Sequence, residues 1–397
     1  MLVHSAALSP ECRLVFLAAN TDGYDDAIGE IARGNLDWRR VVAIAERENA
    51  VAGVWRTLER TAQNVMPSDI AEHLRRSRMV SDFRMLHLEQ RLQTTLRAFR
   101  ERNVPVVLLK GAALGVSVYP SFADRPMVDA DLLVRPADVA RAREAILASG
   151  WRASMDPALE SVYSEHHHLA PFFDAQSTGL RAELHTSIMP ADHPFRLSDD
   201  DVWRDATPAP AAYAGALVPS MSHLLYHACV HFAWSHTMQF GAWRTFRDTA
   251  ELLRTSRIDW DAFVELARAT RGASACYWML RLARHMSGVR VPDQVLAGLP
   301  APSPEWVRRA LERHFVSNIG LGEGPPCPSV RLAYQLWCMA IRPGWSGHGE
   351  RGRWATTRTW ALARTGAAPE PTTTRVMRQI GGLRLWWNYM VRTLVPH

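Results

Sequence analysis

Two aspartates, Asp129 and Asp131, flank one alanine inside the apolar run Met127 to Val134, which predicts a β-strand. Side chains alternate along a strand, so both carboxylates project from the same face and repel each other. A divalent cation bound between them relieves this repulsion, and hard oxygen ligands suit Mg²⁺. The pair therefore predicts a metal site, but surface aspartates are common and the pair alone is a weak signal.

A third carboxylate, Glu183, lies in the segment Arg181 to His185, which predicts another strand with Glu183 and His185 on one face. If the two strands are neighbours, Glu183 joins the aspartates. Three carboxylates can hold two metal ions, which activate an attacking oxygen and stabilise a phosphate while pyrophosphate leaves. Glu183 would complete the metal site or act as a base. The alternative is an exposed strand glutamate without a role.

Residues suited to phosphate binding precede the aspartates. The run Val104 to Leu109 predicts a buried strand, and a short helix is expected over Ala112 to Tyr119. Backbone N–H groups at Gly111 and the helix N-terminus can bind an anion. Lys110 is the only lysine in the chain, beside 45 arginines, and its compact ammonium suits a tight triphosphate site; chance survival of one lysine is the alternative. Arg125 is a second candidate cation for phosphate.

The elements around these residues predict an α+β fold, with a small sheet embedded between helical N- and C-terminal regions. A helix is expected over 136–149, and a hairpin over 167–173 and 180–188. Further helices are expected over 220–232, 242–254, 260–269 and 274–286, and a linker over 322–326. We therefore predict an N-terminal helical region (1–100), a core (101–205), a helical domain (206–320) and an Arg/Trp-rich C-terminal helical region (321–397).

Composition limits the class of protein. The 397 residues are 47% hydrophobic and 22% charged, which is enough to bury a sizeable core over two or three domains. Five scattered cysteines without a CxxC pair give no support to a zinc knuckle or a disulfide framework. Neither a signal peptide nor an apolar run of eighteen residues is evident, so a cytoplasmic location is expected.

Taken in order, these motifs resemble an uncharacterised bacterial nucleotidyltransferase family of the polymerase-beta-type superfamily. The likeness spans roughly residues 30 to 255. It is carried by Leu109, Lys110, Gly111, Leu114, Tyr119-Pro120, Arg125, Asp129, Asp131, Leu132 to Val134, Glu183 to His185 and, more weakly, Arg247-Asp248.

The resemblance implies a mixed sheet and Mg²⁺-dependent transfer of a nucleoside monophosphate from an NTP, with ATP expected, to an unidentified small-molecule, peptide or protein acceptor. Asp129, Asp131 and Glu183 would be the catalytic residues and the ligands of two Mg²⁺ ions. Lys110, Gly111, Arg125 and His185 would bind the nucleotide.

Ala112 departs from the superfamily, in which Gly-Ser is usual, and a phosphate-binding hydroxyl is then missing. Two alternatives stay open. The Arg/Trp-rich C-terminal region could present an RNA 3′ end for nucleotide addition, as a toxin would do. The protein could also be a nucleotide-binding scaffold without activity.

Two groups of histidines also invite explanation. His223, His227 and His231 recur at every fourth position of an expected helix, where packing, a substrate pocket and a zinc site are the alternatives. The run His166 to His168 lies on the strand that precedes Glu183. Nucleotide contact and a structural role both stay open for it.

Overall fold

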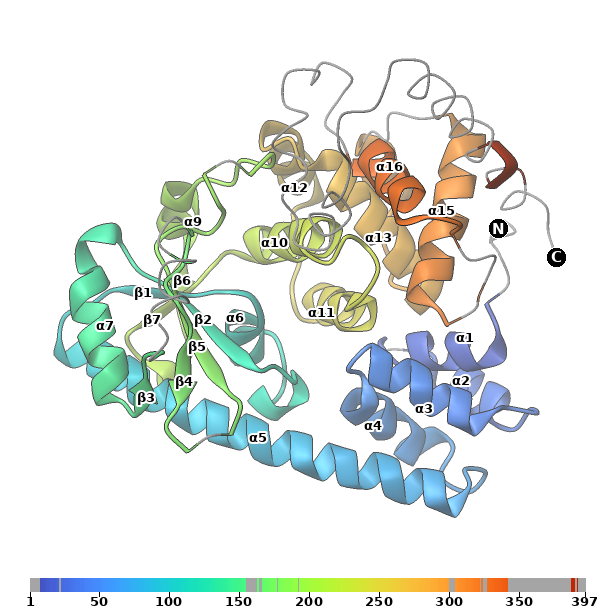
Figure 1. Cartoon of the computed structure of the whole chain (residues 1–397), viewed down its shortest axis with the longest axis horizontal. Helices are drawn as coiled ribbons and strands as arrows, with labels where there is room; N and C mark the ends of the chain where they lie inside the picture. The colour runs from blue at the N-terminus through green and yellow to red at the C-terminus, as the bar shows by residue number, and fades with distance from the viewer. Residues whose placement is uncertain are drawn as a thin grey trace, which may run out of the picture.

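The computed structural model describes residues 8–20, 23–154, 163, 166–176, 178–191, 193–299, 304–321, 323, 327–341, 387–389 and 391. A mixed β-sheet core follows the N-terminal helices in sequence and precedes a larger C-terminal group of helices. In space the sheet lies at one side of the molecule and the two groups of helices contact each other at the other side (Figure 1). This confirms the predicted α+β class. Most of the predicted Arg/Trp-rich C-terminal helical region, including Trp345, Trp354, Trp360 and Trp386, lies outside the described residues.

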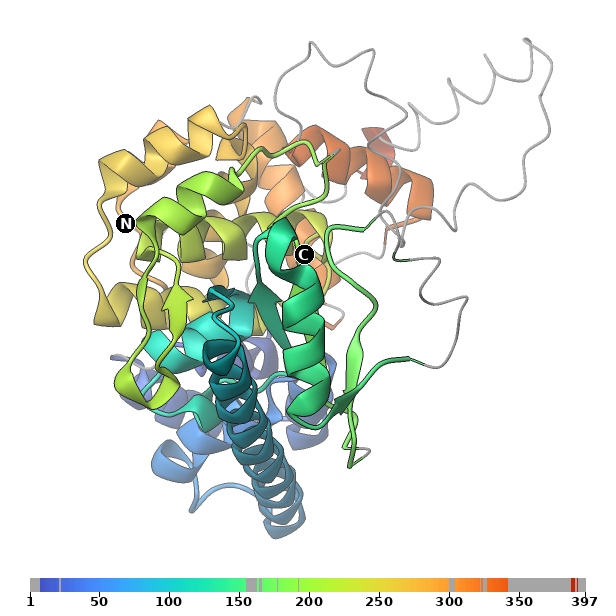
Figure 2. The same ribbon diagram turned by 90° about the vertical axis from the view of Figure 1, so that its left-hand side faces the viewer.

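In the part of the chain that the structure describes, five helices precede the sheet. They are α1 (Pro10–Leu17), α2 (Asp25–Ala32), α3 (Trp38–Arg47), α4 (Val51–Thr61) and α5 (Ser68–Glu101). Ser9 and Asp37 cap α1 and α3, each side chain accepting from backbone N–H groups of the first turn. The 34-residue α5 runs from the N-terminal helices to the core, where it packs against α7 (Val139–Ala148). It thereby connects the two regions along one side of the molecule (Figures 1 and 2).

The sheet has seven strands in the order β3-β4-β5-β2-β1-β7-β6. Their bounds are β1 (Val106–Leu108), β2 (Asp129–Leu133), β3 (Trp151–Arg152), β4 (Phe172–Asp174), β5 (Arg181–His185), β6 (Thr207–Pro208) and β7 (Ala216–Val218). The central β2 is antiparallel to β1 and parallel to β5. The predicted hairpin forms from β4 and β5, and both of its strands are shorter than expected.

Helix α6 (Lys110–Ser117) lies between the sheet and the C-terminal helices, where it contacts β2 and α10 (Met221–Trp234). It begins at Lys110, two residues before the expected start. A 3-10 turn, Pro136–Asp138, precedes α7 and takes up the first residues of the helix predicted over 136–149. These shifts leave the predicted order of elements unchanged.

The C-terminal helices are α10, α11 (Ala242–Thr255), α12 (Trp260–Ala269), α13 (Ala273–Ser287), α14 (Asp293–Gly298), α15 (Glu305–Ile319) and α16 (Val330–Ile341); α9 (Asp199–Asp205) precedes them. The four helices predicted over 220–286 all form. Strands β6 and β7 were not predicted, and they complete the sheet beyond residue 205. None of the helices within the described part of the chain has the length and apolar character that crossing a membrane requires.

Candidate active site

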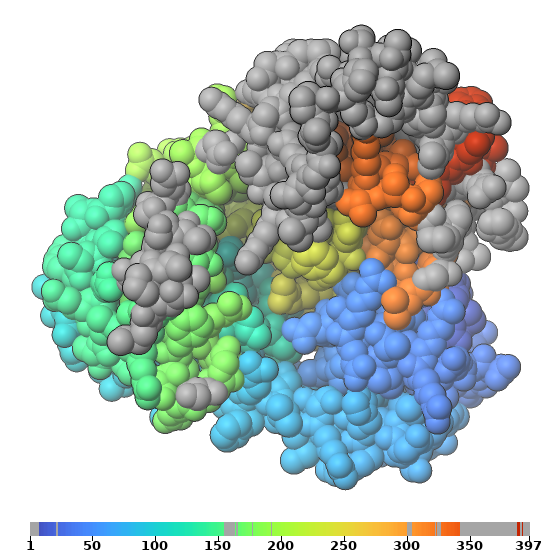
Figure 3. All heavy atoms as spheres, viewed as in Figure 1, coloured from blue at the N-terminus to red at the C-terminus, as the bar shows by residue number. Residues whose placement is uncertain are grey.

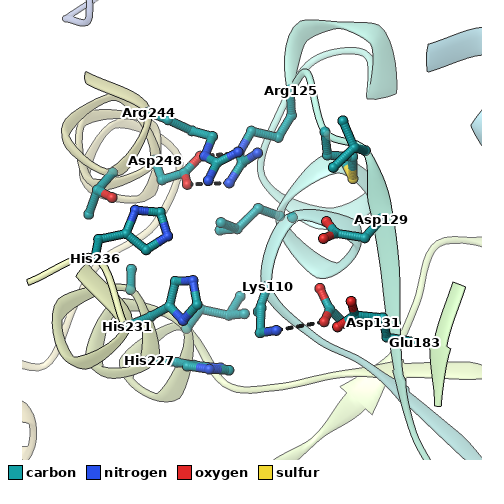
Figure 4. A pocket seen from close by; sticks show the side chains of 17 residues that line it. Lys110, Arg125, Asp129, Asp131, Glu183, His227, His231, His236, Arg244 and Asp248 are labelled. Carbon is teal, nitrogen blue, oxygen red and sulfur yellow. Dashed lines mark hydrogen bonds and ion pairs between the residues drawn. The ribbon is translucent and has the colours of Figure 1, made fainter. Parts of the chain in front are cut away.

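The predicted strands of the carboxylates are neighbours. β2 and β5 pair in parallel, and Asp131 lies directly beside Glu183 in the register. The ladder continues at both ends, through Arg181 N–H to Val128 O (2.9 Å) and Val134 N–H to His185 O (3.0 Å). Because side chains of paired residues point to the same face, the pairing brings Asp129, Asp131 and Glu183 together on one side of the sheet (Figure 4).

Asp131 is almost wholly buried, with 1% of its surface exposed. Its Oδ1 accepts from Lys110 Nζ at 2.6 Å and from His185 Nε2 at 2.9 Å. Burial alone would raise the pKa of Asp131, but the Lys110 charge and the His185 bond hold it well below its usual value. Asp131 is therefore ionised throughout the physiological range.

Asp129, at the open end of the strand, is in the opposite situation. Burial raises the pKa of Asp129, and the like charges of Asp131 and Glu183 raise it further. No hydrogen bond or ion pair joins Asp129 to another of the described residues. The protein therefore neutralises the charge of Asp131 but gives Asp129 no counter-ion. A bound cation would relieve the repulsion between Asp129 and the neighbouring carboxylates.

Lys110 is held in a strained position at the start of α6. Its φ of +45° lies in the left-handed region that favours glycine. The preceding residue, Leu109, donates its N–H to Asp131 O at 3.0 Å, which ties the start of α6 to β2. Burial would lower the pKa of Lys110, but Asp131 and Glu183 raise it above its usual value, so the ammonium stays charged. The left-handed backbone conformation of Lys110 thus holds a permanently charged ammonium beside the carboxylates.

Gly111 follows in a crowded position. A Cβ there would lie 3.1 Å from Met127 Sδ and 3.4 Å from an Arg125 nitrogen, so a side chain would press on both. The next residue, Ala112, is wholly buried and does not line the pocket. The methyl group that replaces the usual serine hydroxyl therefore lies in the core.

Arg125 lines the same pocket, but its guanidinium is already bound. It donates to both carboxylate oxygens of Asp248 in α11, at 2.6 and 2.7 Å, and to Pro126 O at 3.0 Å. Tyr119 adds a third bond to Asp248 at 2.7 Å. All three side chains are buried. These motif residues therefore join the core to α11, and the geometry does not favour the predicted phosphate contact of Arg125.

His185 also differs from the nucleotide-binding role predicted for it. It is wholly buried, does not line the pocket, and lies 3.7 Å from Glu183 Oε2 as well as bonding Asp131. Burial would lower the pKa of His185, but its bonds to Asp131 and Glu183 raise it. The ring orients two carboxylates and has no surface to offer a nucleotide.

A pocket of about 320 Å³ opens beside these residues. The sheet side contributes Lys110, Gly111, Arg125, Asp129, Asp131 and Glu183; the helix side contributes His227, His231, His236, Arg244 and Asp248. Figure 4 shows the two sets facing each other. In the space-filling view the surface is hollowed where the core meets α10–α11 and the N-terminal helices (Figure 3). The volume is of the order that small-molecule sites occupy.

Arg244 is the residue that the sequence analysis missed. It is partly buried in the pocket wall and makes no hydrogen bond or ion pair with any of the described residues. Burial and the nearby Arg125 lower its pKa, yet a guanidinium remains charged. With 45 arginines in the chain, nothing in the sequence sets this one apart. It is distinguished only by its position in the folded protein, opposite Asp129 in the pocket.

The histidines of α10 divide into two kinds. His227 and His231 line the pocket, with rings 6.1 Å apart, and His236 lies 4.7 Å from His231. Burial lowers the pKa of His227 to about 3 and of His236 to about 4, so both rings are neutral. His223 is buried outside the pocket. Among the described residues, no group of three metal-ligating side chains includes His223, His227 or His231, which disfavours the zinc alternative.

The donors present fit a hard divalent ion. Oxygens of Asp131 and Glu183 lie within 4.8 Å of each other, and Asp129 adds a carboxylate at the pocket. Asp131 Oδ2 receives no hydrogen bond from the described residues, so it is available to a cation. Carboxylates at an open pocket leave room for water and phosphate oxygens, as Mg²⁺ requires.

Comparison with known proteins agrees with this geometry. A family model described as uncharacterised nucleotidyltransferase matches residues 34–288, well over half of the chain. The chain belongs to this family. It is therefore a transferase of nucleotidyl groups, and the match includes the sheet, α6 and the α10–α11 wall of the pocket. No curated protein and no solved structure matches the nucleotidyltransferase significantly.

Proposed function

We propose that this nucleotidyltransferase moves a nucleoside monophosphate from an NTP to a small-molecule, peptide or protein acceptor, and that it needs Mg²⁺. Pyrophosphate is the second product. The observation that carries the proposal is the in-register pair of Asp131 and Glu183, with Asp129 beside them, on the wall of a pocket that also holds Lys110. The same face thus offers carboxylates for the metal and a cation for phosphate.

The metal ligands in this proposal are Asp129, Asp131 and Glu183. When bound, divalent ions neutralise triphosphate charge and make the acceptor oxygen a better nucleophile. His185 keeps Asp131 in its orientation through the 2.9 Å bond. The alternative role of Glu183, which is partly exposed and close to His185, is that of a base that accepts a proton from the acceptor instead of binding metal.

Phosphate binding falls to Lys110, the Gly111 backbone and Arg244. Lys110 Nζ is partly exposed and lines the pocket, so it can contact a phosphate oxygen while staying beside Asp131. Arg244 offers a planar fork of N–H donors without a protein partner to give up. Arg125, by contrast, would have to leave Asp248, and we assign it to holding the pocket together.

A transfer assay tests the proposal. Purified protein is incubated with Mg²⁺ and each α-labelled NTP, with four separate acceptors: water, a pool of amino acids and short peptides, the protein itself, and total RNA. We expect labelled product and pyrophosphate in at least one arm, and their loss with Asp129→Ala and Asp131→Ala. The exposed Asp26→Ala is the matched control and should keep full activity.

Two results would refute the proposal or redirect it. NTP binding without pyrophosphate release in any arm would favour a scaffold. Label on RNA alone, lost on salt increase, would favour the RNA 3′-end alternative.

A further inference from the structure

A second cluster of metal-ligating side chains lies at the end of β5, beside the carboxylate site. His166, His167 and His168 follow one another there. The backbone of this run is fixed: His167 O accepts from Thr186 N at 2.9 Å and from Thr186 Oγ1 at 3.2 Å. His168 forms a β-bridge with His185. The three imidazoles therefore extend from an anchored segment.

The rings are close enough to share one ion. Each offers a nitrogen, and the three nitrogens lie within 4.8 Å of one another. The ring centroids are 4.9 to 5.8 Å apart. Tyr163 packs at 5.0 Å against both His166 and His168. Zinc–imidazole bonds are roughly 2.0–2.1 Å long, so nitrogens this close to one another need only side-chain adjustment to share one ion.

Hydrogen bonding also prepares the ligand atoms. His168 Nδ1 lies 2.9 Å from Leu169 O, so Nδ1 carries the proton and Nε2 keeps its lone pair. A backbone carbonyl in that role is typical of metal-ligating histidines. His167 Nδ1 is buried and has no hydrogen-bond partner among the described residues, so no protein group competes with a metal ion for it. Burial lowers the pKa of His167 to about 2, so its ring is neutral.

We propose that His166, His167 and His168 form a binding site for one late first-row divalent metal ion, of which Zn²⁺ is the principal candidate. Imidazole nitrogen prefers such ions to Mg²⁺. Three protein ligands leave the fourth position for water or an outside ligand, as in zinc sites that are not closed. The carboxylate site beside it offers mainly oxygen, so the two neighbouring sites select different ions.

The site differs from the carboxylate site in its residues but touches it through His185. The rings of His167 and His168 lie 5.3 and 4.9 Å from the ring of His185, which bonds Asp131. An ion on the histidines therefore fixes the end of β5 next to Glu183. We expect it to raise the melting temperature of the full chain, because it binds the folded state.

The test uses the full chain without a histidine tag, stripped with a chelator and then titrated with Zn²⁺ in competition with a chromophoric chelator. Co²⁺ serves as a spectroscopic probe, and metal content is measured after dialysis. We expect one Zn²⁺ per chain and a Co²⁺ spectrum of low coordination number. The double variant His166→Gln with His168→Gln should weaken Zn²⁺ binding by at least 100-fold.

Two controls separate this site from its neighbour. Asp131→Asn alters the carboxylate site and should keep the Zn²⁺ stoichiometry, and His73→Gln removes an exposed histidine of α5 that bonds Glu46. His166 is exposed, so His166→Gln alone should weaken binding without loss of fold. Unchanged Zn²⁺ affinity in the double variant overturns the proposal. So does Zn²⁺ loss confined to Asp131→Asn, which would place the ion on Asp131, Glu183 and His185. Neither result depends on nucleotidyl transfer.

Discussion

The two walls of the pocket differ in whether their charged side chains are paired within the protein. On the sheet wall Asp131 accepts hydrogen bonds from Lys110 at 2.6 Å and from His185, which is buried outside the pocket, at 2.9 Å. On the helix wall Arg244 has no partner among the described residues, and His227 and His236 are neutral rings. The bonded charges of the sheet wall keep their geometry without a ligand. The N–H donors of Arg244 on the helix wall, in contrast, are free to bind a ligand. The comparison suggests that the sheet wall performs the chemistry and the helix wall orients the substrate.

The largest effect is expected for Asp131→Asn. This substitution removes the charge to which Lys110 and His185 both bond, so the sheet wall loses a metal ligand and the ion pair that orients Lys110. We expect nucleotidyl transfer to fall by about 10³-fold, since a preorganised charged group at a reacting centre contributes on the order of 10²–10³. Initial rates with an α-labelled NTP measure this. If Asp131→Asn and Asp26→Asn gave equal rates, the sheet wall would not be the site of the reaction.

Arg125→Ala separates structure from substrate binding. It leaves Asp248 buried with only Tyr119 as a donor, and breaking a buried ion pair costs about 3–5 kcal/mol. Urea unfolding should show a loss of that order. Arg135→Ala is the matched control, because its partner Asp200 is exposed and such surface pairs contribute about 0–1 kcal/mol. Equal losses for the two variants would contradict the assignment of Arg125 to holding the pocket together.

Arg244→Ala should behave in the reverse way. No partner is stranded, so the free energy of unfolding should change by less than about 0.5 kcal/mol. The KM for the NTP should rise about 10- to 100-fold, because a hydrogen bond to a charged group contributes about 1.5–3 kcal/mol. Arg244→Lys should recover part of the loss. A stability loss matching that of Arg125→Ala, with an unchanged KM, would show that Arg244 is structural.

A smaller effect concerns pH. His227 has a pKa of about 3 when folded, against a usual 6.5. Between these values the unfolded chain binds a proton that the folded chain does not, so stability falls as pH drops from 6.5 toward 3 and is unaffected by this group above 6.5. The slope from one residue is at most about 1.4 kcal/mol per pH unit. His227→Gln should flatten the fall in unfolding free energy between pH 6.5 and 5. A curve parallel to that of His73→Gln would count against a neutral, buried His227.

The sheet wall was largely predictable from the sequence, and the helix wall was not. Alternation along two strands was enough to place Asp129, Asp131 and Glu183 on single faces, and the structure supplies the parallel pairing that joins them. Arg125 and Asp248, 123 residues apart, meet only through tertiary packing, so a motif that looked like phosphate binding is an internal ion pair. Arg244 carries no local signal at all. Strands β6 and β7 have two and three residues, and β6 contains a proline, which leaves no period to detect.

The pairing of β5 with β2 has a consequence for how this protein can vary. Because the period of a strand is two, a slip of β5 by one residue would send Glu183 to the opposite face and bring Leu184 beside Asp131. A slip of one residue therefore removes the Glu183 carboxylate from the site. Between β2 and β5 the chain forms α7, β3 and β4, and only the connections between these elements are under no such constraint, since the entropy of closing a loop grows only slowly with its length. Insertions in those connections should therefore be tolerated, while a single deletion within β5 should abolish the site.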